Sequence, residues 1–572
     1  MTGLRDAVRR TLQCTVVGST LLGAVSVQAG SIELLSSFSG EEDNGEIVDF
    51  SADGNTIVST VAGDFQGVQI LEIDSAGTFS ERGVVDLTDA FGSEDAIDGA
   101  SSTALDPAGR GIGAVALIPD ANGTEVGKVA LYDYRPGTPD DQRVLAVVDV
   151  GFHPDSVAFS ADGSRLVVAN EGENTAYGDG VGESGAPGSV SVIDLSAVSG
   201  VADAMAVTNA NVTTVDFQSA ANFQAGVSID GLRNNTPDIA TLETNIEPEF
   251  IKVSGTQAFV TLQEANGVAV LDLETNTWSS IFNLGTNEQI VDASNRDGID
   301  IVDPVTGLPM PDSLGLFSSA GTEYFVTANE GDFHPEDLDR VSRIAGLDVD
   351  EVAARFLAEL RARYGDTRAD GSEPFQDEDN LGRLRISAVD GLNADGQFED
   401  FVMPGTRSFS IWNAETGELV FDPGSLEPLL AQLDPAFHNV NDGDPINEFD
   451  ERSDDKGPEP EALAVIDLGG AAYLAVGLER QNGLLIYDIT DPTNAEFLAY
   501  INNATDGLLA PESLTFISPM DSPTGELLLL AGYEDNDGAI ALYSVDVIEP
   551  GTAGLLGLGA LALLARRCQR RT

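Results

Sequence analysis

Residues 248–273 read "PEFIKVSGTQAFVTLQEANGVAVLDL", and this stretch decides the fold. It holds three short runs rich in Val, Ile, Leu and Phe, separated by the turns Ser-Gly-Thr and Gln-Glu-Ala-Asn-Gly. Short apolar runs broken by Gly and Asn are typical of β-strands in an antiparallel meander. A Pro-acid pair opens the first run and a Glu follows the second. These two features identify further copies of the unit elsewhere in the chain.

The same unit recurs along the sequence. Its five clear copies begin at Pro154, Pro248, Pro311, Pro460 and Pro511. Weaker copies from Gly45 and Asp98 bring the number to seven. A unit of three or four strands that repeats about every 50 residues is typical of a β-propeller blade. We therefore predict an all-β fold, a seven-bladed β-propeller, over residues 30–547. A parallel β-helix or a pair of sandwiches are the alternatives.

The fourth strands of the units predict how the ring closes. In the sixth unit "EFLAYIN" (496–502) supplies a fourth strand, but in the seventh only the C-terminal tail follows "AIALYSVD" (539–546). Near the other end, "SIELLSSF" (31–38) is a strand without a unit of its own. We expect this N-terminal strand to complete the last blade and close the propeller, which would cover an exposed sheet edge.

The composition limits the kinds of partner. The 572 residues include 95 Asp and Glu but only 28 Lys and Arg, which gives a formal net charge of −67. Such a surface repels nucleic acid and anionic lipid and attracts cations. The only cysteines, Cys14 and Cys568, lie near the two ends, so we expect neither a disulfide nor cysteine chemistry. The sequence also lacks a Gly-x-Ser-x-Gly elbow, a phosphate-binding Gly-Lys-Ser loop and a zinc signature.

The two ends of the chain predict export. Residues 1–29 read as a secretory signal, with arginines before an apolar run and small residues before a cut after Ala29. Residues 548–572 combine an apolar run, too short for a full span, with a basic cluster and resemble a PEP-CTERM sorting signal. Ile548 stands where that signal usually has its first Pro. The resemblance implies an exosortase-type sorting machinery as a partner and membrane contact only through this segment. We expect the protein at the cell envelope, the outer surface or outside the cell, with extracellular polysaccharide or matrix as a further partner.

The acids of the repeat are expected to form a ring. In a meander, the start of the first strand and the end of the second lie at the same end of the sheet. In a propeller the first strands also line the central channel, so these acids should meet at one channel mouth. The candidate metal ligands are Asp155, Glu171, Glu249, Glu264, Asp312, Glu330, Glu461, Glu479, Glu512 and Glu534, and the weak first unit adds Glu46 and Asp64. By the same reasoning "ERSDDKGPEPE" (451–461) is one sector of this ring.

Such a ring needs positive charge, because neighbouring carboxylates raise one another's pKa or attract cations. A divalent cation such as Ca²⁺ prefers oxygen ligands of this kind. Basic side chains are the alternative, and the carboxylates would then have only a structural role. Arg407, Lys456 and Arg480 lie beside the unit junctions and are candidate ligands for phosphate oxygens.

Two insertions should lie on the same face as the ring. One is the Gly-rich segment 172–188. The other runs from 332 to 406 and is partly helical, since "DVDEVAARFLAELRARYG" (348–365) begins with a capping box of Asp348 and Glu351. We expect this insertion over one face of the propeller, as a cap on the channel mouth. Within it, "DGLNADGQFED" (390–400) resembles a calcium loop, but Gly391 replaces the first ligand and a surface turn is favoured.

The chain contains only three histidines, His153, His334 and His438. Two of them, His153 and His334, lie beside Pro-acid or Glu-Gly junctions and should therefore be near the mouth. A histidine beside carboxylates could act as a metal ligand or a general base, although an incidental loop histidine is the commoner case.

Taken as an ordered set, several motifs resemble the choice-of-anchor I family of exported bacterial propeller-like proteins. They include "EPEFIKVSGTQAFVTLQEANGVAVLDL", "YFVTANEGD", "GTRSFSIWN", "RSDDKGPEPEALAV" and "LERQNGLLIYDITDP", within a likeness that spans roughly residues 40–547. The resemblance implies one conserved body joined to differing C-terminal anchors. Some members of the family carry labels such as alkaline phosphatase-like or phytase-like.

Two functions are therefore open at this point. The first is a surface binding or structural module whose acidic channel mouth binds a cation. The alternative is a metal-dependent phosphomonoesterase, in which the carboxylates hold divalent ions and the basic residues bind phosphate.

Overall fold

The computed structural model describes residues 30–39, 44–62, 65–93, 96–120, 124–172, 186–237, 240–333, 338–441, 443, 447–535 and 538–547. The predicted secretory signal and sorting tail, most of the Gly-rich insertion, Asp64 and His334 lie outside these residues. Within the described part of the chain, no helix combines the length and the apolar character needed to cross a membrane.

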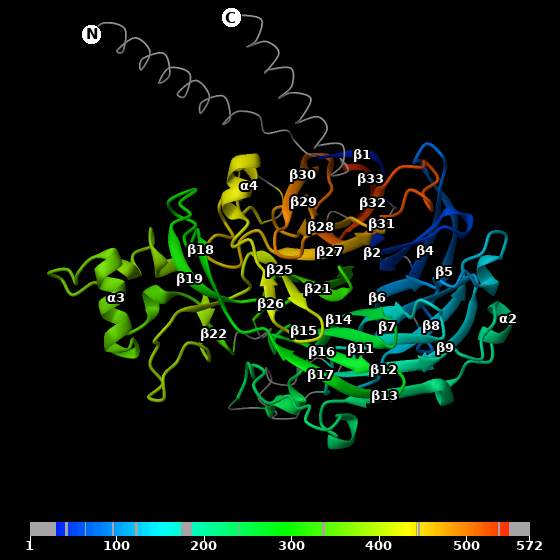
Figure 1. The fold of residues 1–572 in the computed structure, drawn as a ribbon, viewed down its shortest axis with the longest axis horizontal. Coiled ribbons are helices and arrows are strands. Elements are labelled where there is room, and N and C mark those ends of the chain that lie inside the picture. The colour runs from blue at the N-terminus through cyan, green and yellow to red at the C-terminus, as the bar shows by residue number, and fades with distance from the viewer. Residues whose placement is uncertain are drawn as a thin grey trace, which may run out of the picture.

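Most of the described chain folds into seven four-stranded antiparallel sheets (Figure 1). The first four are β2 (Asn44–Ser51), β3 (Thr56–Ala62), β4 (Gln66–Ile73) and β5 (Phe79–Asp86); β6 (Ile97–Leu105), β7 (Ile112–Pro119), β8 (Lys128–Asp133) and β9 (Val144–Asp149); β10 (Pro154–Phe159), β11 (Arg165–Asn170), β12 (Ser189–Asp194) and β13 (Val212–Asp216); β14 (Pro248–Ser254), β15 (Gln257–Leu262), β16 (Gly267–Asp272) and β17 (Thr277–Asn283). The other three are β20 (Leu314–Ser319), β21 (Thr322–Asn329), β25 (Ser408–Asn413) and β26 (Leu419–Phe421); β27 (Pro460–Asp467), β28 (Ala472–Leu478), β29 (Gly483–Asp488) and β30 (Glu496–Asn502); β31 (Pro511–Ile517), β32 (Leu528–Tyr533) and β33 (Ala539–Val547) with β1 (Gly30–Phe38). The fold is therefore all-β, as predicted, and each of the seven repeat units corresponds to one sheet.

The N-terminal strand joins the last sheet. β1 pairs antiparallel with β33, from Gly30 opposite Val547 to Phe38 opposite Ile540. It therefore takes the outer position of a sheet whose other strands come from the C-terminal end of the described chain. The strand predicted at residues 31–38 lies in the expected position.

The first strands of the sheets pack around a common centre. Each contacts the first strand of the next sheet, in the order β2, β6, β10, β14, β20, β27, β31, and β31 contacts β2. Residues from these strands, together with Ser313 just before β20, line one cavity of about 220 Å³. The arrangement is propeller-like, and it brings the starts of strands from distant parts of the sequence to one region.

The middle strands are apolar on both faces because neighbouring sheets cover them on both sides. All residues of β7 and of β28 are buried. Between the last two sheets, for example, Leu484 packs in one cluster with Leu529 and Tyr543. This explains why the repeat reads as unbroken apolar runs instead of alternating with polar residues.

A side lobe is built from two distant parts of the sequence. In it β18 (Asn287–Val291), β19 (Asp303–Leu308) and β24 (Val402–Pro404) form a three-stranded sheet, with β19 and β24 parallel. β22 (Arg340–Val341) pairs with β23 (Ile386–Ser387), and α3 spans Ala354–Tyr364. The lobe has its own core, which includes Phe375, Phe398 and Phe401. The hairpin of β18 and β19 precedes the predicted insertion and was not foreseen.

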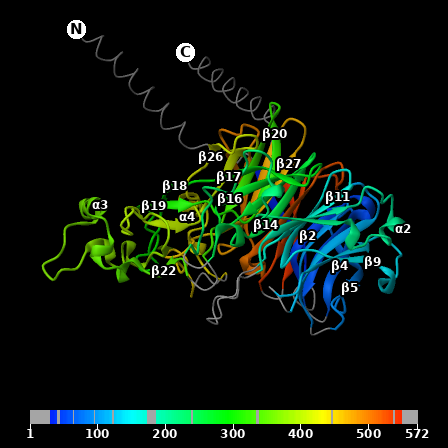
Figure 2. The same cartoon turned by 90° about the horizontal axis from the view of Figure 1, so that it is seen from below.

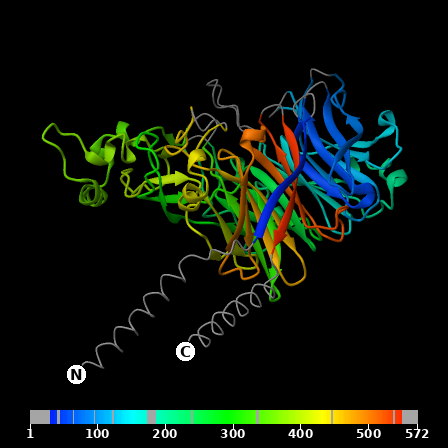
Figure 3. The ribbon, with the colours of Figure 1, turned by 90° about the horizontal axis from the view of Figure 1, so that it is seen from above.

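Two expectations about this insertion need correction. The capping box of Asp348 and Glu351 is present, but it caps a single 3₁₀ turn, Val349–Glu351, and α3 begins only at Ala354. Figures 1, 2 and 3 all place α3 beside the seven sheets and not over the middle of their ring. The lobe is held at the side by its own sheet and by ion pairs, such as that of Arg233 with Asp339 (2.6 Å).

The remaining helices are short. α2 spans Val201–Ala204 and follows the third strand of its sheet, while α4 spans Glu427–Leu433 and follows β26. Between α4 and β27 lies the long connection that contains His438 and most of the charged stretch 451–461, whose last two residues begin β27. This connection borders both the side lobe and the start of β27.

Candidate functional site

The register of the first two strands places the acids of the repeat. In four sheets the proline that opens the first strand lies opposite the last residue of the second. These pairs are Pro154 with Asn170, Pro248 with Leu262, Pro460 with Leu478, and Pro511 with Tyr533. Because the acid that follows the proline and the Glu that follows the second strand adjoin these pairs, both carboxyl groups lie at the same end of their sheet.

A repeated backbone turn fixes this end. The residues before the four prolines of the third, fifth, sixth and seventh units have positive φ, namely His153 (42°), Met310 (44°), Glu459 (51°) and Ala510 (52°). Each of their carbonyl groups accepts a hydrogen bond from an amide one or two residues after strand two, at 2.8 to 3.1 Å. Left-handed backbone is uncommon for residues other than glycine, so four copies of it indicate a tightly specified rim.

The acids from different sheets meet at this rim. Burial first, and then the charges of Glu171, Glu264, Asp155 and Asp312, raise the pKa of Glu249 well above its usual value. These neighbours belong to three sheets. Their mutual repulsion means that carboxyl groups far apart in sequence share one region.

Acids from different sheets also meet on the other side of the rim. Burial, followed by Glu479, Glu512, Glu330 and Asp312, raises the pKa of Glu461 well above its usual value. Burial and the neighbouring carboxyl groups also raise the pKa of Glu46, Glu264 and Glu479 to about 8. The pKa of Asp155 rises to about 6, chiefly through burial. We define the rim acids as Glu46, Asp155, Glu171, Glu249, Glu264, Asp312, Glu330, Glu461, Glu479, Glu512 and Glu534.

The tightest group within the rim is formed by Glu330, Glu461 and Glu479. One carboxylate oxygen from each lies within 4.8 Å of the others, and all three side chains are buried. Glu461 is 8% exposed and lies close enough to Glu479 and Glu512 to share a proton with them. Without such a proton, its Oε2 has no hydrogen-bond donor. Three buried oxygens with one unsatisfied atom form an arrangement suited to a hard cation.

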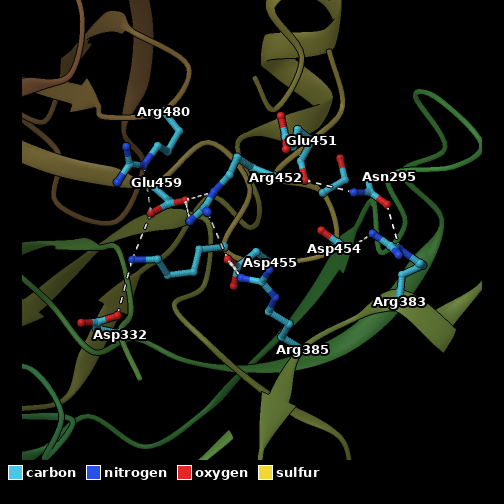
Figure 4. A network of polar contacts seen from close by, with 12 residues as sticks. Asn295, Asp332, Arg383, Arg385, Glu451, Arg452, Asp454, Asp455, Glu459 and Arg480 are labelled. Atoms are coloured by element: carbon cyan, nitrogen blue, oxygen red, sulfur yellow. Dashed lines mark hydrogen bonds and ion pairs between the residues drawn. The ribbon is translucent and has the colours of Figure 1, made fainter. Parts of the chain in front are cut away.

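Basic side chains lie beside this group and surround Glu459 (Figure 4). Lys456 Nζ contacts Glu330 and lies 3.0 Å from Glu459 Oε2 and 3.7 Å from Asp332 Oδ1. Burial alone would raise the pKa of Glu459, but Lys456, Arg452 and Arg480 outweigh it and hold this pKa at about 2. Glu459 is thus an ionised partner of three cations, and no local feature of the sequence distinguishes it from Glu461.

The stretch 451–461 therefore divides into two roles. Asp454 pairs with Arg383 (2.7 Å) and Arg343 (3.0 Å), and Asp455 pairs with Arg385, all from the side lobe (Figure 4). Glu461 is the residue of this stretch that lies in the tight carboxylate group. Asp454 and Asp455 tie the lobe to this stretch, so the interpretation of the whole stretch as one sector of the ring was too broad.

Arg407 lies in a closed environment. Its side chain is fully buried, and Nη1 bonds Glu427 Oε1 and the Asp292 carbonyl at 2.7 Å each. Nη2 bonds the carbonyls of Ser453 (2.9 Å) and Asp455 (2.7 Å). Both terminal nitrogens are thus fully engaged at a side chain that is 0% exposed, so this geometry supports a structural role and we leave Arg407 out of the proposed ligand site. Arg480 pairs with Glu479 (2.5 Å), and Lys456 pairs as described above.

The histidines lie in different surroundings. His153 Nε2 is 3.4 Å from Glu171 Oε2 at the rim, with the ring half-buried. His438 is fully buried, and its Nε2 is 3.0 Å from Asp292 Oδ2. Sequence reasoning assigned His438 no role, because no motif surrounds it. The acids near it in sequence, 442 to 450, were the available signal.

The loop 390–400 is a turn. The Asn393 side chain accepts hydrogen bonds from the amides of Asp395 (2.9 Å) and Gln397 (3.0 Å). Gly391 has φ of 71°, and a Cβ there would lie 2.4 Å from the Asp400 carbonyl. Its neighbour Asp390 pairs with Arg233 (2.7 Å). The surface turn favoured by the sequence is therefore what this loop forms.

Comparison with known proteins identifies relatives of part of the chain. It is 31% identical over 184 residues to Gigasin-3a of Magallana gigas, covering 29% of this chain and 64% of that protein. It is 28% identical over 221 residues to the mesenchyme-specific cell surface glycoprotein of Strongylocentrotus purpuratus, covering 35% of this chain and 28% of that protein. The chain thus spans less than two thirds of the length of either relative.

A solved structure, the hydrazine synthase of Kuenenia stuttgartiensis, superimposes with a TM-score of 0.43 at 12% identity, covering 88% of this chain and 96% of that chain. The model of the choice-of-anchor I domain matches residues 46–492, which run from within β2 to just past β29. A match of this kind indicates a cell-surface or exported protein. Because it covers well over half of the 572 residues, the chain belongs to the choice-of-anchor I family.

Proposed function

We propose that this protein is an exported surface or matrix module whose rim acids bind a divalent cation, best Ca²⁺, at the mouth of a closed seven-bladed propeller. The observation that carries the proposal is the group of Glu330, Glu461 and Glu479, whose oxygens converge within 4.8 Å while Glu461 Oε2 lacks a donor. Hard cations take carboxylate oxygens of this kind. The cell-surface name of the sea urchin relative is consistent with this location.

The charge around the group supports a cation there. The pKa of Glu479 and of Glu264 is raised to about 8, first by burial and then by other carboxyl groups. At neutral pH the rim must therefore hold protons or a positive ion. Lys456 supplies one positive charge beside Glu330, but Glu461 and Glu512 each keep a buried oxygen without a donor. A divalent ion would satisfy these oxygens and remove the repulsion.

We expect Glu461→Gln and Glu479→Gln to weaken Ca²⁺ binding by at least about tenfold, because each removes one charged ligand while keeping its shape. Calorimetric titration of the full chain with Ca²⁺, after treatment with a chelator, measures this. Glu526→Gln is the matched control, because Glu526 is exposed and precedes β32, at the opposite end of that strand from the rim acid Glu534. Equal Ca²⁺ affinity in the wild type and both rim variants, or no binding by the wild type, would exclude the site.

The closed ring is part of the same proposal. It is supported by the contact of β31 with β2 and by the pairing of β1 with β33. Ile32 of β1 is buried and packs in one cluster with Leu498 and Val545. If β1 holds the ring closed, Ile32→Ser should lower the free energy of unfolding by roughly 2–4 kcal/mol. Glu33→Ser, at the exposed neighbouring position, should change it by less than about 0.5 kcal/mol.

Urea unfolding of both β1 variants measures the difference. Identical stabilities would show that β1 contributes nothing to the folded body and would contradict closure by this strand.

The alternative function, a metal-dependent phosphomonoesterase, finds less support. It would use Arg407, Lys456 or Arg480 to bind phosphate oxygens, but Arg407 is enclosed and the other two pair with rim acids. A phosphate would have to displace these ion pairs before it could bind. Hydrolysis of a chromogenic phosphomonoester with Ca²⁺ or Zn²⁺, lost in Glu479→Gln, would reverse this preference.

Delivery to the surface rests on the two ends of the chain. We propose that the N-terminal signal directs export and that the C-terminal segment is handled by an exosortase-type sorting machinery. A cation held between rim carboxylates can also bridge to acidic groups on a second polymer, so extracellular acidic polysaccharide is the partner class that this site favours.

A further inference from the structure

A second group of metal-ligating side chains lies apart from the rim acids. It consists of Asp292, which directly follows β18 in the side lobe, and of His438 and Asp450 from the connection between α4 and β27. One ligand atom from each lies within 4.8 Å of the other two, and all three side chains are buried. The group therefore brings together residues from the lobe and from the body of the protein.

The distances suit a small ion. His438 Nε2 lies 3.0 Å from Asp292 Oδ2 and 3.9 Å from Asp450 Oδ1. Tetrahedral Zn²⁺, with bonds of about 2.0–2.1 Å, would separate its ligand atoms by roughly 3.3 Å. Both distances lie close to that value, so little movement is needed to bring the three atoms around one ion.

The protein holds each ligand in place. The Asp292 amide donates to Glu427 Oε2 (3.2 Å) and its carbonyl accepts from Arg407 (2.7 Å). The Asp450 amide donates to the His438 carbonyl (3.0 Å), and Asp450 Oδ1 accepts from the Ser453 hydroxyl (2.6 Å). These bonds position the residues without occupying the imidazole Nε2.

A fourth polar side chain is directed at the same group. Asn439 is fully buried, and its amide nitrogen lies 3.5 Å from His438 Nε2. Its Oδ1 has no hydrogen-bond partner among the described residues. The amide nitrogen also donates to Glu427 Oε1 (2.6 Å) and Ser453 Oγ (2.8 Å), so Oδ1 becomes a ligand if the amide group turns over. If Nε2 carries a proton, that single N–H can donate to Asp292 or to Asp450 but not to both. The imidazole alone therefore cannot satisfy both carboxylates.

From this geometry we infer that Asp292, His438 and Asp450 bind a divalent transition-metal ion of the Zn²⁺ type, at a site distinct from the rim. The imidazole makes the difference: a nitrogen ligand suits Zn²⁺, whereas the rim offers only carboxylate oxygens, which suit Ca²⁺. Asn439 or a water molecule would complete the coordination. Because Asp292 belongs to the lobe and the other two ligands to the body, the ion would also fasten the two parts together.

The test is Zn²⁺ titration of the full chain by calorimetry, after chelator treatment and in excess Ca²⁺ to occupy the rim. We expect one Zn²⁺ per chain, with affinity at least about 100-fold lower in His438→Gln and at least about tenfold lower in Asp450→Asn. Glu461→Gln, a rim variant, and His153→Gln, at a rim histidine, should bind Zn²⁺ like the wild type. Thermal melting in chelator shows whether each variant is folded.

A purely structural hydrogen bond between His438 and Asp292 predicts a different result. His438→Gln would then lower the melting temperature but leave Zn²⁺ affinity within twofold of the wild type, and that outcome overturns the proposal. If His438→Gln does not fold, Asp450→Asn decides in the same way. In the wild type, Zn²⁺ should also shift the imidazole NMR signals of His438, one of only three histidines in the chain. Unshifted signals would likewise exclude the site.

Discussion

Without divalent cations, the full chain should be less stable at about pH 8.5 than at about pH 5.5, by on the order of 3 kcal/mol. The rim acids cause this difference. The pKa of Glu46, Glu264 and Glu479 is about 8 in the folded protein, raised by burial and by neighbouring carboxyl groups. A shift from 4.5 to about 8 in a single group corresponds to roughly 5 kcal/mol in all, of which roughly 3 kcal/mol falls between about pH 5.5 and 8.5.

The sign follows from the number of protons bound. Between about pH 4.5 and 8, the folded rim keeps protons that the unfolded chain has released. Stability is therefore highest below the unfolded pKa and falls as the pH rises through the folded values. Glu459 adds nothing in this window, because its pKa of about 2 leaves it ionised throughout. The rim groups share protons, so their shifts do not add, and the contribution of one group over this pH interval is the expected size.

Thermal and urea unfolding in chelator at the two pH values measure the effect. Millimolar Ca²⁺ should remove most of it, because the ion replaces the protons. Glu461→Gln combined with Glu479→Gln should flatten the profile without Ca²⁺, since two of the repelling charges are gone. Equal or greater stability at the higher pH in chelator would show that the rim is not strained by its own charge. The basis of the proposed cation site would then be lost.

Much of the fold could be predicted from sequence because its signals are local. Each strand of the repeat lies between turn residues, and proline marks the first strand in Pro154, Pro248, Pro460 and Pro511. Because the same unit recurs along the chain, the strand assignment in one unit supports the assignment in the others. Even the N-terminal strand could be assigned, because one sheet lacked its fourth strand.

The side lobe could not be predicted in the same way. Its sheet pairs Thr306 with Val402 in parallel, and nothing near either residue indicates the other. The start of α3 was misjudged for a related reason. The capping box at Asp348 is a local signal that is compatible with a 3₁₀ turn as well as with an α-helix. The helix α3 itself begins later, at Ala354.

The candidate site was foreseen as a set of acids but not in its detail. The meander rule brings Glu330, Glu461 and Glu479 together, since their positions in the repeat are equivalent or adjoining. Which acids are neutralised depends instead on Lys456 and on arginines of the lobe, such as Arg385. The grouping of Asp292 with His438 depends on the lobe as well, so no sequence pattern predicted it.

Replacing the buried Arg407 should destabilise the protein strongly. We expect Arg407→Met to lower the free energy of unfolding by about 3–5 kcal/mol, because it leaves the buried charge of Glu427 without its partner. The carbonyls of Asp292, Ser453 and Asp455 would lose their donor as well. Gly457 packs against this arginine, since a Cβ there would lie 2.7 Å from Arg407 Cδ.

A double-mutant cycle separates the ion pair from the packing. Arg407→Met with Glu427→Gln should recover part of the loss, because no uncompensated charge then remains buried. Arg355→Met is the matched control. Its side chain is 92% exposed and pairs only with Glu359 within the same helix, so the change should stay within about 0.5 kcal/mol. Urea unfolding gives all four values.

The result also decides between two roles for Arg407. If it is the structural centre of this junction, Arg407→Met destabilises the protein strongly, and the damage extends to His438, because Asn439 and Asp292 are both held through Glu427. A variant as stable as the wild type that has lost binding of inorganic phosphate would mean the opposite. In that case the arginine would serve a ligand, and the phosphomonoesterase hypothesis would regain one of its three basic residues.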